Sequence, residues 1–120
     1  MKIGINLLAV VVVSLFISAA QAEIIEPHPM DMTQAIENAK TAADHEALAK
    51  HYEEVAKRMQ LKVQEHEKLL EKYETNAHLY GRLGERLQAH CKMLIRSYED
   101  AAKANMEMAE SHRSMAAEMK

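Results

Sequence analysis

Residues 42–74 decide the fold of this chain: AADHEALAKHYEEVAKRMQLKVQEHEKLLEKYE. The stretch contains no proline or glycine and consists mostly of strong helix formers. It therefore predicts one long helix, of roughly 50 Å at a rise of about 1.5 Å per residue. Residues seven apart return to nearly the same face of such a helix. We call the most regular of these sets the first core column, with members His45, Tyr52, Met59, His66 and Tyr73.

A second long helix is predicted from about residue 85 to residue 120. It carries a matching second core column, with members Cys91, Tyr98, Asn105, His112 and Met119. Residues 76–84 interrupt the pattern with Asn76, Gly81 and Gly84, residue types that end or weaken helices. We therefore expect an antiparallel helical hairpin whose turn is centred between residues 78 and 79. This register sets four pairs level: His45 with His112, Tyr52 with Asn105, Met59 with Tyr98, and His66 with Cys91.

The chain before the hairpin falls into three pieces. Residues 1–22 join a short basic start to an apolar run and a small-x-small ending, which predicts a secretory signal peptide cleaved after Ala22. An uncleaved membrane anchor is the alternative, although the apolar run is shorter than a comfortable span. Residues 23–31 contain two prolines and should be extended. A short helix over residues 32–40 should then bend into the long helix near Thr41.

The fold class is therefore all-α, with a helical domain over residues 32–120. Each long helix has three adjacent apolar strips, which two helices cannot bury between themselves. A second copy of the hairpin would cover the rest, so we expect a dimeric four-helix bundle. Cys91 is the single cysteine of a chain expected to be periplasmic or secreted. It can form a Cys91–Cys91 disulfide between copies, bind a metal or stay free.

Charge and motifs exclude several classes of function. The formal net charge is −3 with both signs interspersed, which disfavours nucleic-acid binding and stable residence at a membrane surface. Cys-x-x-Cys-His, Glu-x-x-His and His-Glu-x-x-His are all absent, and so is a glycine-rich phosphate loop. No nucleophile has a base and an orienting third group. We expect a protein that is not an enzyme.

Imidazole, thioether and thiolate groups together are ligands typical of copper. Two clusters of them are predicted. The distal cluster joins His45 to His112, with Met108 and Met115 one turn to either side of His112. The proximal cluster combines His66, His90 and Cys91. A third, flexible set near the start of the mature chain consists of His28, Met30 and Met32. The expected function is therefore copper binding or buffering.

Simpler interpretations stay open for each residue type. Methionine at helical spacing commonly fills gaps in a core. A histidine on a packed face commonly forms a hydrogen bond to tyrosine or a carboxylate. Haem b held by histidine and methionine is a weaker alternative, because the chain has few aromatic residues. The alternative function is a structural or chaperone-like hairpin without a cofactor, which would bind partner proteins through its methionine-rich helix.

Overall fold

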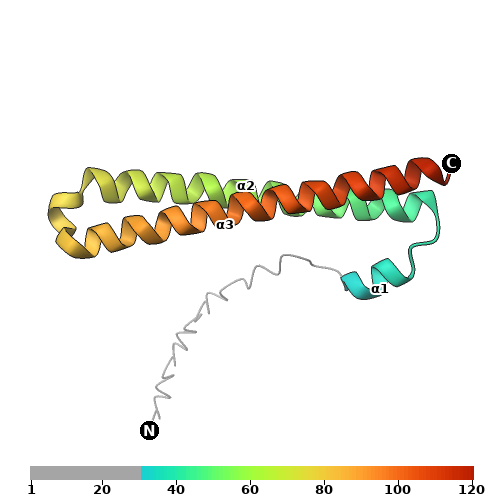
Figure 1. The fold of residues 1–120 in the computed structure, drawn as a ribbon, viewed down its shortest axis with the longest axis horizontal. Coiled ribbons are helices and arrows are strands. Elements are labelled where there is room, and N and C mark those ends of the chain that lie inside the picture. The colour runs from blue at the N-terminus through green and yellow to red at the C-terminus, as the bar shows by residue number, and fades with distance from the viewer. Residues whose placement is uncertain (1–30) are drawn as a thin grey trace, which may run out of the picture.

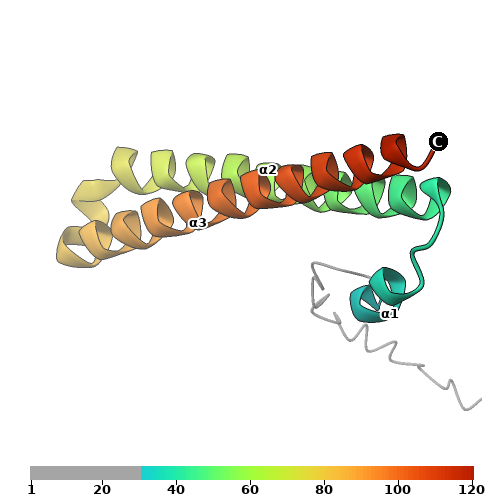
Figure 2. The same cartoon turned by 45° about the vertical axis from the view of Figure 1, so that its right-hand side comes forward.

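The computed structural model describes residues 31–120, and it arranges them as a helical hairpin preceded by a short helix (Figure 1). The elements are α1 (Met32–Glu37), α2 (Ala42–Thr75) and α3 (Ala77–Glu118). Helices α2 and α3 run antiparallel along their whole length (Figure 1). In both views, a short loop joins α1 to the start of α2, and α1 lies beside the hairpin (Figures 1 and 2). The predicted signal peptide, most of the predicted extended segment and the side chains of His28 and Met30 lie outside the described residues.

Both predicted helix starts are confirmed by their capping hydrogen bonds. The backbone N–H of Gln34 donates to the Asp31 carboxylate at 3.1 Å, which satisfies one free donor of the first turn of α1. Helix α2 begins with a capping box in which the Asp44 N–H donates to the Thr41 hydroxyl and the Thr41 N–H donates to the Asp44 carboxylate. These hydrogen bonds hold the pKa of Asp44 below its usual value, with the Lys40 N–H making the largest contribution.

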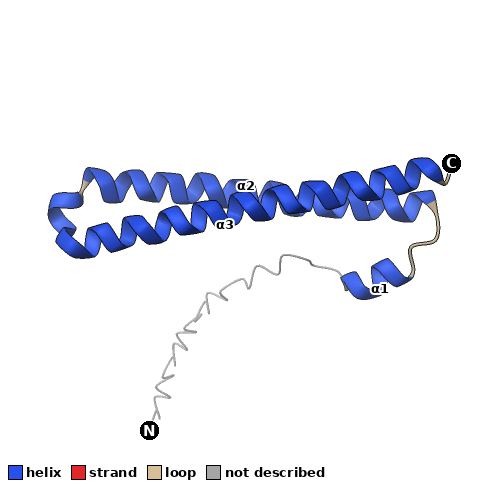
Figure 3. Ribbon diagram, in the orientation of Figure 1, coloured by secondary structure: helices blue, strands red, loops and turns tan. Residues whose placement is uncertain are grey.

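The reversal of the hairpin lies later in the chain than its predicted centre between residues 78 and 79. Only Asn76 separates the two long helices, and Figure 3 shows helical backbone almost to the end of the hairpin. The reversal is completed at Gly81, which has a φ of 52° and a ψ of −135° inside α3. A side chain would be strained in this conformation, so glycine is required there. Helical backbone lies on both sides of this kink, and the long part of α3 that follows Gly81 begins a few residues before the predicted start near residue 85.

The hairpin is packed tightly in one half only. We call the half that holds the start of α2 and the end of α3 the open half, and the other the turn half. The buried side chains of the open half are mostly small, which lets the two helices approach closely: Leu48, Ala49, Tyr52, Val55, Ala56, Ala102, Ala109 and Ala116. In the turn half, large apolar side chains stay exposed, among them Leu61, Leu79, Leu83 and Met93.

Two ion pairs show how the helices are rotated about their axes. Arg113 contacts Glu53 and Lys120 contacts Glu46, each with an N···O distance of 2.6 Å. Arg113 lies between Ala109 and Ala116 on the surface of α3, so this edge is turned toward α2. We call its buried residues the alanine strip: Ala102, Ala109 and Ala116. The opposite edge carries a second seven-residue repeat, which we call the flank strip: Leu87, Leu94, Ala101, Met108 and Met115.

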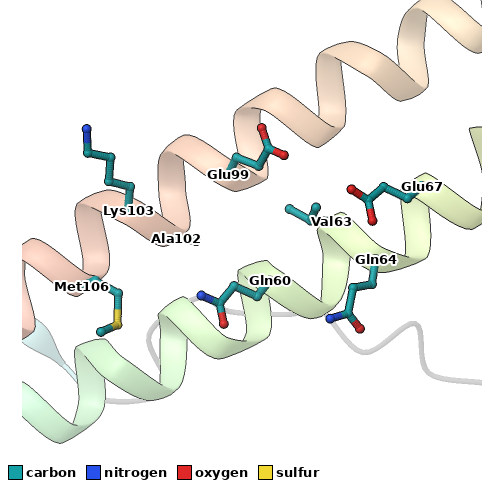
Figure 4. A pocket seen from close by; sticks show the side chains of 8 residues that line it. All are labelled: Gln60, Val63, Gln64, Glu67, Glu99, Ala102, Lys103 and Met106. Atoms are coloured by element: carbon teal, nitrogen blue, oxygen red, sulfur yellow. The ribbon is translucent and has the colours of Figure 1, made fainter.

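A shallow groove of about 490 Å³ runs between α2 and α3 near the middle of the hairpin (Figure 4). Glu67 of α2 and Glu99 of α3 lie across this groove from one another, with Ala102 of the alanine strip in its floor. The groove is open to solvent and has no enclosed apolar pocket of the kind that binds small molecules. We therefore place the candidate site elsewhere.

Candidate functional site

The open end of the hairpin brings His45 and His112 into direct contact. Their Nδ1 atoms are 3.1 Å apart, and their rings stack with centroids 5.3 Å apart and an angle of 22° between planes. An imidazole Nδ1 can donate to another Nδ1 only if the second is unprotonated. At least one of the two rings is therefore neutral in this arrangement. The predicted contact between these two residues of opposite helices is therefore present.

The site is built in the well-packed open half of the hairpin. His45 follows the capping box of α2 by one residue, and His112 lies between Ala109 and Ala116 of the alanine strip. The Tyr52 ring stacks on the other face of the site, with its centroid 5.6 Å from that of His112 and an angle of 7° between planes. Backbone geometry and packing therefore fix the position of both rings.

Burial decides the charge of the pair. His112 retains only 6% of its exposure, and this loss of solvent lowers the pKa of its imidazole below the usual 6.5. The positive charge that His45 can carry lowers it further. His112 is therefore neutral at neutral pH, which leaves a ring nitrogen with a free lone pair in the contact with His45.

The three residues of the predicted proximal cluster do not form a metal-binding group within the described residues. His66 is half-buried, and the ring of Tyr98 stacks on it with centroids 5.5 Å apart. The Nδ1 atom of His66 is buried and has no hydrogen-bond partner within the described part of the chain. Cys91 is also buried, with 6% exposure, but its neighbour His90 is exposed. Adjacent helical residues point about 100° apart, so α3 cannot turn both toward α2.

The cross-helix contacts correct the predicted register. Tyr52 was expected opposite Asn105, but it contacts His112, seven residues further along α3. Tyr98 was expected opposite Met59, but it contacts His66, seven residues further along α2. Both shifts have the same direction and follow from the later turn at Gly81. The His45–His112 contact survives because His112 lies between His45 and Tyr52 and touches both rings.

The two predicted methionine ligands lie beside the histidine pair. Met108 and Met115 precede and follow His112 by four and three residues, which are neighbouring positions on a helix surface. Their side chains are 40% and 44% exposed. Both belong to the flank strip, on the edge of α3 turned away from the ion pairs with α2.

Within residues 31–120, no three histidine, cysteine, aspartate or glutamate side chains lie close enough together to hold a metal ion. The structure therefore offers two converging imidazole nitrogens at the open end, with thioethers on the neighbouring turns. The proximal residues His66, His90 and Cys91 do not form a group of three. Sequence reasoning missed the stacking roles of Tyr52 and Tyr98, although both belong to the core columns that it identified.

The cross-helix ion pairs were also missed. Glu46 and Glu53 are seven residues apart on α2, and Arg113 and Lys120 are seven residues apart on α3. That matched spacing in opposite charges was the signal available in the sequence. The two pairs flank the histidine site on the alanine-strip side and fix the register of the open half.

Comparison with protein-family models, with curated proteins and with solved structures finds no match to this chain. None of the described helices is both long and apolar enough to cross a membrane. What can be said of function therefore depends on the site itself.

Proposed function

We propose that this chain is an exported helical protein that binds copper at the open end of the hairpin, through His45 and His112. The observation that carries the proposal is the 3.1 Å separation of the two Nδ1 atoms, contributed by opposite helices. Two imidazole nitrogens bound to one ion at about 2.0 Å in tetrahedral geometry lie roughly 3.3 Å apart. The observed separation is close to that value, and rotation of the two rings, whose nitrogens point at one another, would direct both lone pairs at an ion.

The charge state of the site supports metal binding. An imidazole must be unprotonated to coordinate a metal, and proton release otherwise opposes binding. Burial already lowers the pKa of His112, so this ligand is ready at neutral pH. The Tyr52 ring and the two flanking ion pairs restrict movement of the site, which reduces the entropy lost on binding.

Copper is favoured over other metals by the available third ligands. Met108 and Met115 lie on the turns either side of His112, and their exposed, flexible thioethers can swing toward it. Thioether sulfur prefers Cu(I), whereas imidazole binds several metals. The proposed site therefore combines two nitrogens of fixed position with one sulfur from a neighbouring turn.

The test is a competition titration of the purified protein with Cu(I) against a chromophoric chelator. We expect one tight equivalent per chain, lost in His45→Ala and in His112→Ala. Replacement of both Met108 and Met115 by leucine keeps their bulk and removes sulfur, so it should weaken Cu(I) binding and leave Zn²⁺ binding unchanged. The matched control is His78→Ala, which removes an exposed histidine at the other end of the hairpin. Unchanged Cu(I) affinity in His112→Ala would reject the proposal.

A second candidate function is a cofactor-free hairpin that binds other proteins. It is favoured by the exposed apolar side chains of the turn half, including Leu61, Leu79, Leu83 and Met93 at 57–67% exposure. Under this alternative, no copper binding above that of the chelator control is expected. The contact between His45 and His112 would then only stabilise the packing of the start of α2 against the end of α3.

A further inference from the structure

The flank strip is an apolar repeat that the hairpin leaves partly uncovered. Leu94, Met108 and Met115 are 40%, 40% and 44% exposed, whereas the alanine strip on the other edge of the same helix is buried. The strip repeats every seven residues from Leu87 to Met115. An uncovered repeat of this kind matches another long helix with the same period, because only such a helix stays in contact along the whole strip.

The surface beside the flank strip also suits helix packing. The next residues around α3 on that side are His90, Ser97, Ala104 and Ser111, all exposed and none with a formal charge at neutral pH. Three of the four are small, so a second helix could approach closely. The opposite edge of α3 differs, because Arg113 and Lys120 there are occupied by ion pairs with α2.

We propose that a second copy of this chain covers the flank strip, with the two α3 helices antiparallel and Ala101 close to the two-fold axis. The order of residue sizes supports this occupant. Two large side chains follow Ala101 in each direction along the strip. They are Leu94 and Leu87 toward the N-terminus of α3, and Met108 and Met115 toward its C-terminus. A two-fold axis at Ala101 brings each residue of one copy against the residue of the other copy that is equally far from Ala101. Leu94 would then meet Met108, and Leu87 would meet Met115, so large side chains pack against large ones.

Charge distribution selects the antiparallel alignment. Residues 31–56 and 101–120 together carry nine carboxylates and five lysines and arginines, whereas residues 57–100 carry nine lysines and arginines and seven carboxylates. An antiparallel dimer lays the acidic open half of one copy over the basic turn half of the other. A parallel dimer would set the acidic halves together, which is unfavourable.

The available area is that of a stable dimer. The strip from Leu87 to Met115 is about 42 Å long at about 1.5 Å per residue. With α2 alongside, the face is about 20 Å wide, since one helix with its side chains is about 10 Å across. This gives roughly 800 Å² per copy, which is typical of specific protein–protein interfaces.

The axis position has a consequence for Cys91. This residue lies ten positions from Ala101, so the two copies of Cys91 would be roughly 30 Å apart along the bundle at about 1.5 Å per residue. Disulfide formation needs Cα atoms about 5.5 Å apart. The proposed dimer therefore excludes the Cys91–Cys91 disulfide, one of the three states that the sequence left open for this residue.

The first experiment measures the mass of the full chain by sedimentation equilibrium in EDTA, so that the outcome is independent of copper binding. We expect a dimer for the unmodified chain, and a monomer with unchanged helical content for the double variant Met108→Glu/Met115→Glu. The matched control is Ala89→Glu/Ala117→Glu, which adds the same charge at exposed positions of α3 outside the flank strip and should remain dimeric.

The second experiment tests the alignment by oxidative cross-linking in a Cys91→Ser background. Ala101→Cys should give a disulfide-linked dimer, and Lys103→Cys, at the same level but 78% exposed on its side chain, should not. A monomeric unmodified chain would overturn the proposal, whether the strip is then open or covered by the chain's own N-terminal segment. A dimer that persists in Met108→Glu/Met115→Glu, or one linked through the native Cys91, would overturn it equally.

Discussion

The unequal packing of the two halves can be tested with one substitution made at two positions. Val55 is 1% exposed and is the largest side chain of the described chain that is fully buried. Val63 lies one turn beyond the open half on the same helix, is half-buried, and borders the solvent groove. Replacement of each by alanine removes the same atoms, so the difference in unfolding free energy reports packing alone.

The expected magnitudes follow from the burial of each residue. At Val55, the loss of two carbons costs about 1.6 kcal/mol of transfer free energy, at about 0.8 kcal/mol per buried CH₂. An uncollapsed cavity of about 50 Å³ adds roughly 1.2 kcal/mol. The better helix propensity of alanine returns roughly 0.6 kcal/mol. Val55→Ala should therefore destabilise by about 2 kcal/mol, while at Val63 the smaller loss and the propensity gain nearly cancel.

The assay is urea unfolding followed by circular dichroism at a fixed protein concentration. We expect the midpoint to fall clearly for Val55→Ala and to stay within error of the unmodified chain for Val63→Ala, with equal slopes. Equal destabilisation by both substitutions would show that the turn half is packed as tightly as the open half. That result would refute the claim that only the open half is tightly packed.

Three further predictions concern single features of the hairpin. Folding holds the pKa of His112 below 6.5, so the unfolded chain binds more protons than the folded chain at low pH. The free energy of unfolding should therefore be unaffected by this residue above about pH 6.5 and should decrease as the pH falls below it. Thermal melts of His112→Gln should lose this pH dependence. Gly81→Ala should destabilise by about 1–3 kcal/mol, because a Cβ is strained at a φ of 52°, and a wild-type urea midpoint would contradict this. The side chains of Glu53 and Arg113 are 28% and 48% exposed. A double-mutant cycle of the two residues should give a coupling energy of about 0.5–1 kcal/mol that falls with added salt. A coupling energy independent of salt would contradict the assignment as a surface ion pair.

Much of the fold could be predicted from local rules. The absence of proline and glycine over residues 42–74 and the capping residues Asp31 and Thr41 determined where helices run and begin. The seven-residue columns correctly indicated an antiparallel pair. The register of the hairpin could not be predicted, because it depends on how Gly81 reverses the chain inside α3, and glycine permits many conformations.

The candidate site was predicted at one end and not at the other. His45 and His112 lie near the ends of their helices, and their rings still meet although the ion pairs set a register that differs from the predicted one. His90 and Cys91 are neighbours in sequence, so the rotation of α3 decides which of them faces α2. That rotation follows from the packing of the alanine strip, which the sequence pattern alone did not distinguish from the flank strip.

The most direct test of the copper site is ¹⁵N NMR of the histidine side chains during addition of one equivalent of Cu(I), which is diamagnetic. The account predicts that the Nδ1 resonances of His45 and His112 shift together and saturate at one ion per chain, while the side chain of His90 is unaffected. A shift confined to His66 or His90, or saturation without any change at His112 Nδ1, would contradict it.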